Sequence, residues 1–442
     1  MDDTKYKITI VGGGSTWTPG LLKSLCIKKD KLPLRELVLY DIDEKRQELI
    51  GKFAQILFSE ENEQVKVIYT TSKEIAYENT DFVFCQIRSG GFKMRELDEK
   101  IPLKYGVVGQ ETCGPGGFAY GLRSIPDMIE IVNDVRKRSK DTWILNYTNP
   151  AAIVAFALDK VFPEDKRILN ICDQPINLLK SYGKIVNTDY KELQPVYFGL
   201  NHFGWFKNLY NKEGVDLAPT IKETILKNGF EPADKEERDQ SWLDTYAMVK
   251  KILENYPEYL PNTYLQYYLY PEYKVSQLNP NYTRTNEIIN GREKRVFLES
   301  QRVIDKNTAK GSPLAVNEAH ADMIVDLAAA IVNNTNEEFI LITRNEGTIS
   351  NIPEDAMVEV NCAMDKNGPR KFSVGAISTF YKGLIEQQYA YEKLTCEAFF
   401  EKSYHKALAA LTLNRTVIDG FKAKKILDEL IIANKGYWPE LL

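Results

Sequence analysis

A cysteine and a histidine in two short segments of this sequence could together bind a divalent metal ion. Cys172 and Asp173 follow an apolar run, and His202 lies thirty residues further on, within residues 199–205. Thiolates and imidazoles are common metal ligands, and two protein ligands leave coordination positions open for hydroxyl groups of a substrate. The alternative is structural, because single cysteines and histidines are often simply buried in a core.

A glycine turn near the start of the chain could bind a nucleotide phosphate. The apolar run 7–11 leads directly into Gly12, Gly13, Gly14 and Ser15, and a helical pattern follows. At such a turn the bare backbone lets a pyrophosphate approach closely, and the positive end of the helix dipole favours its charge. The third glycine of the common GxGxxG pattern is absent, so the fingerprint is incomplete. The alternative is an ordinary glycine turn.

An acidic residue at the end of the next strand supports the nucleotide interpretation. Asp41 closes the apolar run 36–41, where a carboxylate would accept hydrogen bonds from the hydroxyl groups of a ribose. It lies 29 residues after Gly12, which is farther than the roughly 20 residues of the common pattern. Asp41 favours NAD over NADP, whereas the neighbouring Lys45 and Arg46 leave NADP open.

The elements that must position these residues alternate between strand and helix patterns. Apolar runs separated by helical segments predict βαβ units, and therefore an α/β fold with a Rossmann-like, doubly wound parallel sheet. In such a sheet Cys172 and Asp173 would lie at the carboxyl ends of the strands, where ligands bind. The predicted strands are residues 7–11, 36–41, 65–69, 81–85, 143–146 and 167–171, and the predicted helices between them include 19–28 and 44–58.

The pattern changes after about residue 195. We therefore expect two domains, an NAD-binding Rossmann-like domain over 1–195 and a mixed α/β domain over 196–442 that carries substrate, metal and oligomerisation functions. This layout is like that of lactate and malate dehydrogenases. In the second domain helices are expected over 232–257, 316–334 and 383–412, with strands at 339–342 and 357–360.

One segment is too rich in glycine for regular structure. Residues 109–117 contain four glycines and a proline, which predicts either a mobile loop that closes over a site or a long connection. Tyrosines crowd a second segment, residues 262–268, and such a run is by default core packing.

Composition excludes several classes of protein. The chain has 442 residues and a net charge of −5, with 62 acidic against 57 basic side chains, so a nucleic-acid or polybasic membrane binder is disfavoured. No apolar run reaches the roughly 18 residues that a membrane span needs. The six scattered cysteines and the absence of a signal-peptide pattern indicate a cytoplasmic protein. With three histidines, a site built from several of them is nearly excluded.

Longer stretches of the chain resemble the family 4 glycoside hydrolases, and most closely the members that act on 6-phospho-α-glucosides. The resemblance runs in order through nearly the whole chain, and the family uses the same GGGS turn. The stretches that carry it are VGGGSTWTPG (11–20), DEKIPLKYGVVGQETCGPGGFAYGLRSI (98–125), LNYTNPAAIVA (145–155), ILNICDQPI (168–176), YFGLNHFGW (197–205), PNTYLQYYLYP (261–271), NPNYTRTNE (279–287) and ANKGYWPELL (433–442).

The resemblance implies a mechanism that differs from the two-carboxylate chemistry of most glycosidases. NAD⁺ would take a hydride from C3 of the sugar, a base would remove the C2 proton, and the glycosidic oxygen would leave by elimination. Water would then add and the hydride would return, so that the cofactor is regenerated. The expected reaction is hydrolysis of 6-phospho-α-glucosides such as maltose 6′-phosphate to glucose 6-phosphate.

The resemblance also implies roles for individual residues. Cys172 and His202 would hold a divalent metal, Mn²⁺ in this family, which polarises the C2 and C3 oxygens of the sugar. Tyr264 would be the base for the C2 proton, and Glu111 would raise its basicity. Asp173 would be the acid that protonates the leaving oxygen.

Substrate binding is implied for Arg95, Asn149 and Arg284, since a planar guanidinium donates paired hydrogen bonds to phosphate oxygens. Asp173 also resembles the branch that acts on α-glucosides, whereas the 6-phospho-β-glucosidases carry asparagine at this position. The family further implies a homodimer or homotetramer.

Three other interpretations compete with this one. The nearest is a 6-phospho-β-glucosidase of the same family. An NAD-dependent 2-hydroxy-acid dehydrogenase would share the two-domain layout but would accumulate NADH, and it would need a well-placed catalytic histidine, for which His202 is the available residue. A non-catalytic NAD-binding regulator would turn over no sugar phosphate.

Overall fold

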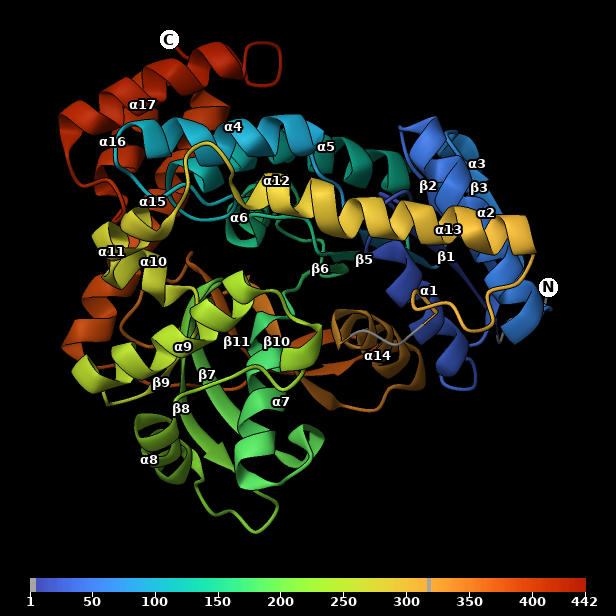
Figure 1. Cartoon of the computed structure of the whole chain (residues 1–442), viewed down its shortest axis with the longest axis horizontal. Helices are drawn as coiled ribbons and strands as arrows, with labels where there is room; N and C mark the ends of the chain where they lie inside the picture. The colour runs from blue at the N-terminus through green and yellow to red at the C-terminus, as the bar shows by residue number, and fades with distance from the viewer. Residues whose placement is uncertain (1–4, 316–318) are drawn as a thin grey trace.

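A computed structural model describes residues 5–315 and 319–442, and one mixed sheet of twelve strands runs through this part of the chain (Figure 1). Its first six strands are parallel and follow the order β3-β2-β1-β4-β5-β6. This is the strand order of dinucleotide-binding folds, so the predicted Rossmann-like sheet is confirmed. These strands are β1 (Tyr6–Val11), β2 (Leu34–Tyr40), β3 (Lys66–Thr70), β4 (Phe82–Cys85), β5 (Trp143–Asn146) and β6 (Ile168–Asn170).

The rest of the sheet is antiparallel and continues from the edge of β6. Ile342 of β10 pairs with Asn170 of β6, and the order then runs β10-β11-β7-β8-β9, with β12 on β11. One hydrophobic core spans both parts, from Ile10 in β1 to Val360 in β11. The division of the chain near residue 195 stays a prediction. The antiparallel strands are β7 (Gln194–Leu200), β8 (Phe203–Tyr210), β9 (Leu260–Pro261), β10 (Glu337–Arg344), β11 (Met357–Asp365) and β12 (Gly368–Lys371).

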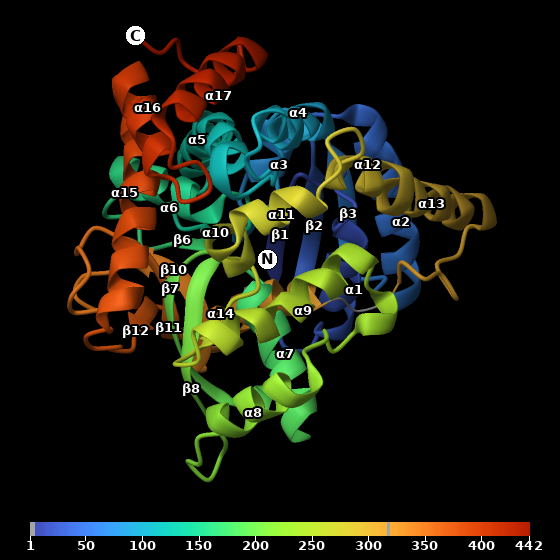
Figure 2. The same ribbon diagram turned by 60° about the vertical axis from the view of Figure 1, so that its left-hand side comes forward.

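The helices that follow the parallel strands cover that part of the sheet, and the helices at the end of the chain pack against them (Figure 1, Figure 2). Of the described helices, none is long and apolar enough to cross a membrane. The helices are α1 (Thr18–Ile27), α2 (Glu44–Glu61), α3 (Lys73–Tyr77), α4 (Gly91–Lys104), α5 (Gly114–Arg138), α6 (Ala151–Val161), α7 (Gln174–Val186), α8 (Ala218–Asn228), α9 (Gln240–Asn255), α10 (Leu265–Leu269), α11 (Pro271–Gln277), α12 (Arg284–Ile288), α13 (Lys294–Lys306), α14 (Ala319–Asn333), α15 (Thr379–Glu401), α16 (Tyr404–Leu413) and α17 (Gly420–Ala433), with short turns η1 (Tyr190–Glu192), η2 (Lys235–Glu237) and the π-helix η3 (Ile289–Glu293).

Three sequence predictions need correction, and local capping explains two of them. The helix expected from residue 232 begins at Gln240, because the Asp239 side chain caps it by accepting a hydrogen bond from the Trp242 amide. The single helix expected over 383–412 is two helices, α15 and α16. Lys402 adopts the left-handed conformation with φ of 53°, and Ser403 caps α16.

The third correction concerns the glycine-rich segment 109–117, which we expected to be irregular throughout. Its second part is the buried first turn of α5, which begins at Gly114. A Cβ atom on Gly116 would lie 2.2 Å from the Gln110 carbonyl oxygen, and one on Gly117 would lie 2.5 Å from that of Thr112. The glycines therefore let the preceding loop lie directly against the start of the helix. The predicted helix start at residues 316–318 lies outside the described residues.

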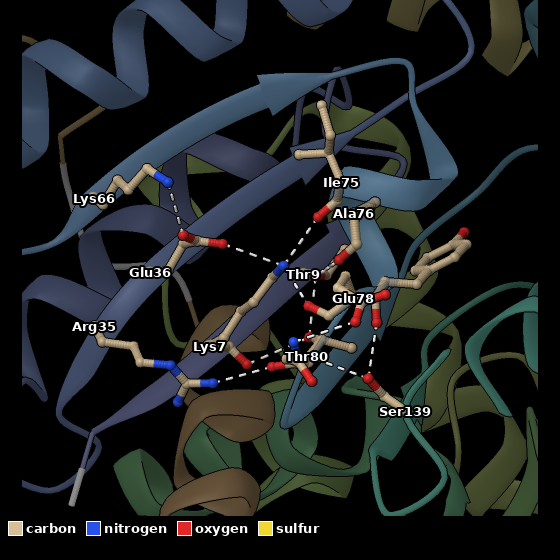
Figure 3. A network of polar contacts seen from close by, with 12 residues as sticks. Lys7, Thr9, Arg35, Glu36, Lys66, Ile75, Ala76, Glu78, Thr80 and Ser139 are labelled. Atoms are coloured by element: carbon tan, nitrogen blue, oxygen red, sulfur yellow. Dashed lines mark hydrogen bonds and ion pairs between the residues drawn. The ribbon is translucent and has the colours of Figure 1, made fainter. Parts of the chain in front are cut away.

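A polar network holds the amino ends of the parallel strands (Figure 3). The Lys7 ammonium, which is buried, donates hydrogen bonds to the carbonyls of Ile75 at 2.9 Å and Glu78 at 2.7 Å, and pairs with Glu36 at 3.2 Å. The Thr9 hydroxyl also donates to a backbone carbonyl. Because these polar groups are satisfied by each other, this end of the sheet is structural, and the chemistry-bearing residues gather at the opposite, carboxyl end.

Candidate active site and family membership

The predicted nucleotide turn lies between β1 and α1, at the carboxyl end of the parallel strands. The amides of Gly12 and Gly13 both donate to the Tyr40 carbonyl at 2.9 Å, which ties the turn to β2. Gly12 has φ of 85°, and a Cβ atom there would lie 2.8 Å from the Gln86 carbonyl oxygen. Only glycine fits such a position, and its bare backbone is what a pyrophosphate can approach. The residues of the turn therefore fit a dinucleotide.

Asp41 lies directly beside this turn. Its Oδ2 atom accepts a hydrogen bond from the Gly14 amide at 2.9 Å, and its Oδ1 atom accepts one from the Asp43 amide at 3.0 Å. The carboxylate thus orders the glycine turn and keeps further lone pairs for a ribose. Recognition of the ribose by Asp41 stays a prediction.

Residues from far along the chain cover the turn. Trp17 stands where the third glycine of the common pattern would be, and the guanidinium carbon of Arg292, in η3, lies 3.1 Å from the centroid of its ring. Arg292 also donates to the Thr16 carbonyl at 3.3 Å. Nearby, Arg46 forms an ion pair with Glu293. These long-range partners could not be predicted from sequence patterns.

The two predicted metal ligands lie together. Cys172 follows β6, His202 lies in the tight turn between β7 and β8, and the Cys172 Sγ atom is 3.4 Å from the His202 Nε2 atom. Both side chains are buried. If both atoms bound one ion at about 2.0–2.3 Å, the angle between the two bonds would be roughly 100°, which is compatible with tetrahedral or octahedral coordination. The donor set and its spacing fit a divalent metal.

His202 is held in an unusual conformation. Its φ of 59° lies in the left-handed region, which costs free energy in a residue other than glycine and is typical of functional sites. The Thr112 hydroxyl lies 3.3 Å from Nδ1, and this contact orients the ring so that Nε2 faces Cys172. Burial lowers the pKa of His202 to about 4, so the imidazole is neutral near pH 7, as a metal ligand must be.

The pKa of the Cys172 thiol is shifted in the opposite direction from that of His202. Burial raises its pKa well above the usual range, and the charges of Glu359 and Asp173 add to the effect. A bound cation favours the thiolate, so metal binding and loss of the thiol proton are coupled here. Among the described residues no group of three or more His, Cys, Asp and Glu side chains could hold a metal. The pair leaves open the positions that a substrate can fill.

Tyr264 completes the centre of the site. It follows β9 and caps α10, and its ring stacks on the imidazole of His202 with 3.9 Å between centroids and 10° between planes. Burial raises the pKa of Tyr264 well above its ordinary range, and the neighbouring Tyr267 and Glu111 raise it further. Within the tyrosine-rich segment 262–268, this residue therefore lies against the predicted metal ligand His202 and is not simply core packing.

Asp173 is the N-terminal cap of α7, next to Cys172. Its Oδ1 atom accepts a hydrogen bond from the Tyr147 hydroxyl, and its Oδ2 atom accepts one from the Asn177 side chain at 2.9 Å. Gln174, the next residue, donates to the Thr263 hydroxyl at 2.5 Å. This last contact joins α7 to the segment that carries the predicted base.

Glu111 lies in the loop that the α5 glycines support. Its carboxylate pairs with Arg88 and with Arg95 at 3.2 Å. Burial alone would raise the pKa of Glu111, but the two guanidinium groups outweigh it and hold the pKa below its usual range. Glu111 is therefore charged near pH 7. The charge of Arg95 is shared between Glu111 and Glu99, whose Oε1 atom is 2.9 Å away.

The other two predicted substrate residues lie in different surroundings. Arg284, at the start of α12, donates to Asp239 at 2.5 Å and to Glu287 at 2.7 Å, and it is less buried than Arg95. The Thr285 amide next to it donates to Glu99, so α12 is linked to the Arg95 cluster. Asn149 precedes Pro150 through a cis peptide bond and is half-buried.

The structure thus brings together Cys172, His202 and Tyr264, with Asp173 and Glu111 close enough to affect their pKa values. Sequence reasoning missed the partners Arg88, Thr112 and Tyr147. Thr112 adjoins Glu111, and Tyr147 lies within the stretch 145–155, so a search of residues beside the motifs could have found both.

This arrangement defines an α/β protein in which one sheet carries a glycine turn that fits a dinucleotide and a Cys–His pair that fits a metal ion. Two family models match the chain: that of family 4 glycosyl hydrolases over residues 7–188, and that of the family 4 glycosyl hydrolase C-terminal domain over residues 197–417. The chain belongs to family 4 of the glycosyl hydrolases.

Similar proteins have specific names. The chain is 50% identical over 446 residues to phospho-α-glucosidase PagL and 49% identical over 440 residues to maltose-6′-phosphate glucosidase MalH, both from Clostridium acetobutylicum. In each case 99% of both chains is covered. Identity to a protein of Bacillus subtilis named probable 6-phospho-β-glucosidase is lower, 32% over 447 residues, covering 98% of this chain and 97% of that protein.

Solved structures share the whole fold. A 6-phospho-α-glucosidase from gut microorganisms in complex with NAD and Mn²⁺ is 53% identical with a TM-score of 0.97, covering 99% of this chain and 100% of that chain. Another 6-phospho-α-glucosidase from gut microorganisms, in complex with NAD and glucose 6-phosphate, is 41% identical with a TM-score of 0.95 over the same shares.

Proposed function

We propose that this protein is an NAD- and Mn²⁺-dependent 6-phospho-α-glucosidase that hydrolyses substrates such as maltose 6′-phosphate to glucose 6-phosphate and an aglycone. The observation that carries the proposal is the buried pair of Cys172 and His202, 3.4 Å apart, with the Tyr264 ring stacked on the imidazole. The names of the relatives and the NAD, Mn²⁺ and glucose 6-phosphate in similar structures support it.

The residues divide the work as follows. When bound, NAD⁺ accepts and returns a hydride at C3 of the sugar, while Mn²⁺ polarises the oxygens at C2 and C3. Cys172 and His202 hold the metal, and the stacked Tyr264 takes the proton from C2. The negative charge of Glu111 raises the pKa of Tyr264 and so makes its phenolate a stronger base.

Asp173 acts on the leaving group. Its contact with the Tyr147 hydroxyl fixes the carboxyl at the entrance of α7, beside Cys172. In its protonated form Asp173 gives a proton to the glycosidic oxygen as the bond to C1 breaks. Arg284 supplies positive charge for the sugar phosphate, with Arg95 and Asn149 as further substrate-binding residues.

In this mechanism one cofactor serves many turnovers, because the hydride returns to the sugar. Gly12, Gly13, Gly14 and Ser15 receive the pyrophosphate of NAD, and Asp41 receives the ribose. We further propose that the protein is cytoplasmic and forms a homodimer or homotetramer. Sedimentation of the purified protein checks the oligomeric state.

Paired substrates test the proposal directly. p-Nitrophenyl α- and β-glucoside 6-phosphates are assayed with and without Mn²⁺ and NAD⁺, and we expect cleavage of the α substrate only when both are present. A marked preference for the β substrate would instead identify a 6-phospho-β-glucosidase. Net accumulation of NADH would identify a dehydrogenase, and no turnover of any sugar phosphate would leave a non-catalytic NAD-binding protein.

A further inference from the structure

A buried carboxyl group that the proposed mechanism does not use lies beneath the site. Glu359 is in β11, which lies between β10 and β7 in the sheet (Figure 1), and its exposed fraction is 1%. Its Oε1 atom accepts a hydrogen bond from the Asn201 side chain at 3.0 Å. Its Oε2 atom accepts one from the Tyr197 hydroxyl at 3.1 Å. A buried carboxyl is costly unless it is well partnered, so its presence calls for a function.

One of the two donors, Asn201, is adjacent in the chain to the proposed metal ligand His202. Asn201 and His202 form the two-residue turn between β7 and β8, in which Leu200 pairs with Phe203. His202 has a φ of 59° in this turn, and a residue other than glycine stays there only when its surroundings fix it. The hydrogen bond from Asn201 to Glu359 supplies such a constraint from the neighbouring strand.

The other donor, Tyr197, is linked by hydrogen bonds to the proposed base Tyr264. The Tyr197 hydroxyl, which donates to Glu359, also accepts a hydrogen bond from the Asn262 side chain at 3.2 Å. The Oδ1 atom of Asn262 in turn accepts one from the Tyr264 amide at 3.0 Å. Tyr197 and Asn262 are completely buried, so this chain of contacts does not compete with solvent.

The geometry points to Glu359 as a positioning residue for both parts of the site: we propose that it sets the His202 turn through Asn201 and the Tyr264 segment through Tyr197 and Asn262. One carboxyl group therefore fixes the metal ligand and the base relative to each other. The side chains that face it are Asn201 and Tyr197, with Asp173 and Cys172 close enough to interact with its charge.

This inference rests on the proposed function, and two variants test it. Glu359→Gln keeps the size of the side chain but turns one acceptor into a donor, so that Asn201 and the Tyr197 hydroxyl can no longer both donate to it. We expect the dissociation constant for Mn²⁺ alone, measured by paramagnetic resonance or calorimetry, to rise by about 10–100-fold. Exchange of the C2 proton with D₂O should slow, while KM for the sugar phosphate changes less than kcat.

Tyr197→Phe tests the link to Tyr264 separately from the link to His202. It deletes only the hydroxyl and keeps the ring packed on Phe206, so the fold is preserved. We expect slower C2 proton exchange with an unchanged Mn²⁺ affinity, because only the contact toward Tyr264 is lost. The matched control is Glu392→Gln, which changes an equally buried carboxyl in α15 whose partner is Gln388. This control should leave Mn²⁺ affinity and proton exchange unchanged.

The outcomes are distinguishable. If the parent enzyme cleaves the α substrate but Glu359→Gln binds Mn²⁺ like the control, the inference is wrong and the proposed function stands. Unchanged proton exchange in Tyr197→Phe would also overturn the inference, whatever the folding of the first variant. If the parent enzyme itself neither binds Mn²⁺ nor cleaves sugar phosphates, the proposed function fails and the inference fails with it.

Discussion

The imidazole of His202 and the phenol ring of Tyr264 lie face to face, with centroids 3.9 Å apart and 10° between their planes. The stack places the proposed metal ligand, just before β8, directly against the proposed base, just after β9. Because the His202 Nε2 atom also faces Cys172, the same ring orients the proposed base and the proposed metal site. Proton abstraction next to a polarised oxygen needs this kind of fixed geometry.

Replacing Cys172 by serine should remove metal-dependent activity. A serine hydroxyl is a weaker ligand than a thiolate, so the Mn²⁺ affinity should fall by about 100-fold or more. Loss of a residue that only hydrogen-bonds to a metal ligand typically costs about 10–100-fold, and loss of a ligand itself should cost at least as much. Binding of NAD⁺, followed by fluorescence, should remain, since the glycine turn is separate. The control is Cys396→Ser, whose buried Sγ atom donates to the Ile153 carbonyl, as a hydroxyl can. Equal Mn²⁺ affinity in both variants would exclude Cys172 as a ligand.

Replacing Tyr264 by phenylalanine should keep the stack and remove the base. Exchange of the C2 proton with D₂O should slow by about 10²–10⁴-fold, the usual contribution of general acid–base catalysis. Tyr267→Phe is the matched control, because that ring lies 5.8 Å from Tyr264 and has no role in the proposed mechanism. Exchange that stays fast without the Tyr264 hydroxyl would point to another base.

Stability should depend on pH through Glu392. Burial raises its pKa from 4.5 to about 8, so the native state favours the protonated form. The stability that this provides is complete below pH 4.5 and is lost as the pH rises toward 8, at up to about 1.4 kcal/mol per pH unit. Glu392→Gln cannot ionise, and its gain in unfolding free energy over the parent should therefore be larger at pH 7.5 than at pH 5.

Denaturant unfolding at the two pH values measures this difference. Glu359, whose pKa is also raised to about 8 by burial, is present in both proteins and so largely cancels. A gain that is the same at both pH values would mean that Glu392 is charged in the folded protein at pH 5.

Adding one methyl group at Gly116 should disturb the site from a distance. The new Cβ atom would lie 2.2 Å from the Gln110 carbonyl oxygen, so the loop that carries Glu111 must move. We expect kcat to fall by about tenfold or more, since displacement of a catalytic group by about 1 Å can cost 100-fold. Gly383→Ala, in α15 with open space around it, is the control and should slightly stabilise the helix. Unchanged kcat in Gly116→Ala would show that the loop adapts.

Much of the fold was accessible from the sequence, because the parallel strands are continuous apolar runs separated by amphipathic helices. The same reasoning identified Cys172 and His202 as possible ligands and left a buried structural pair as the alternative; the structure places the two atoms 3.4 Å apart. The resemblance to a family was needed for Tyr264, which pattern alone assigned to the core.

Other features could not be read from the sequence, since they depend on contacts between distant segments. Glu359 is an acidic residue in an apolar strand, and only the tertiary structure reveals Tyr197 and Asn201 as its partners. The helical start of α5 was missed because a cluster of glycines normally interrupts a helix. Here glycines are required by the closeness of the loop carrying Glu111.

The continuous sheet limits how this enzyme can open. The glycine turn and the metal pair are attached to strands that are joined across β6 and β10, where Asn170 pairs with Ile342. A hinge between the two parts would have to break that pairing, so the proposed NAD site and the proposed metal site keep a fixed separation. Entry of the sugar and escape of the products must then be achieved by the helices and loops outside the sheet.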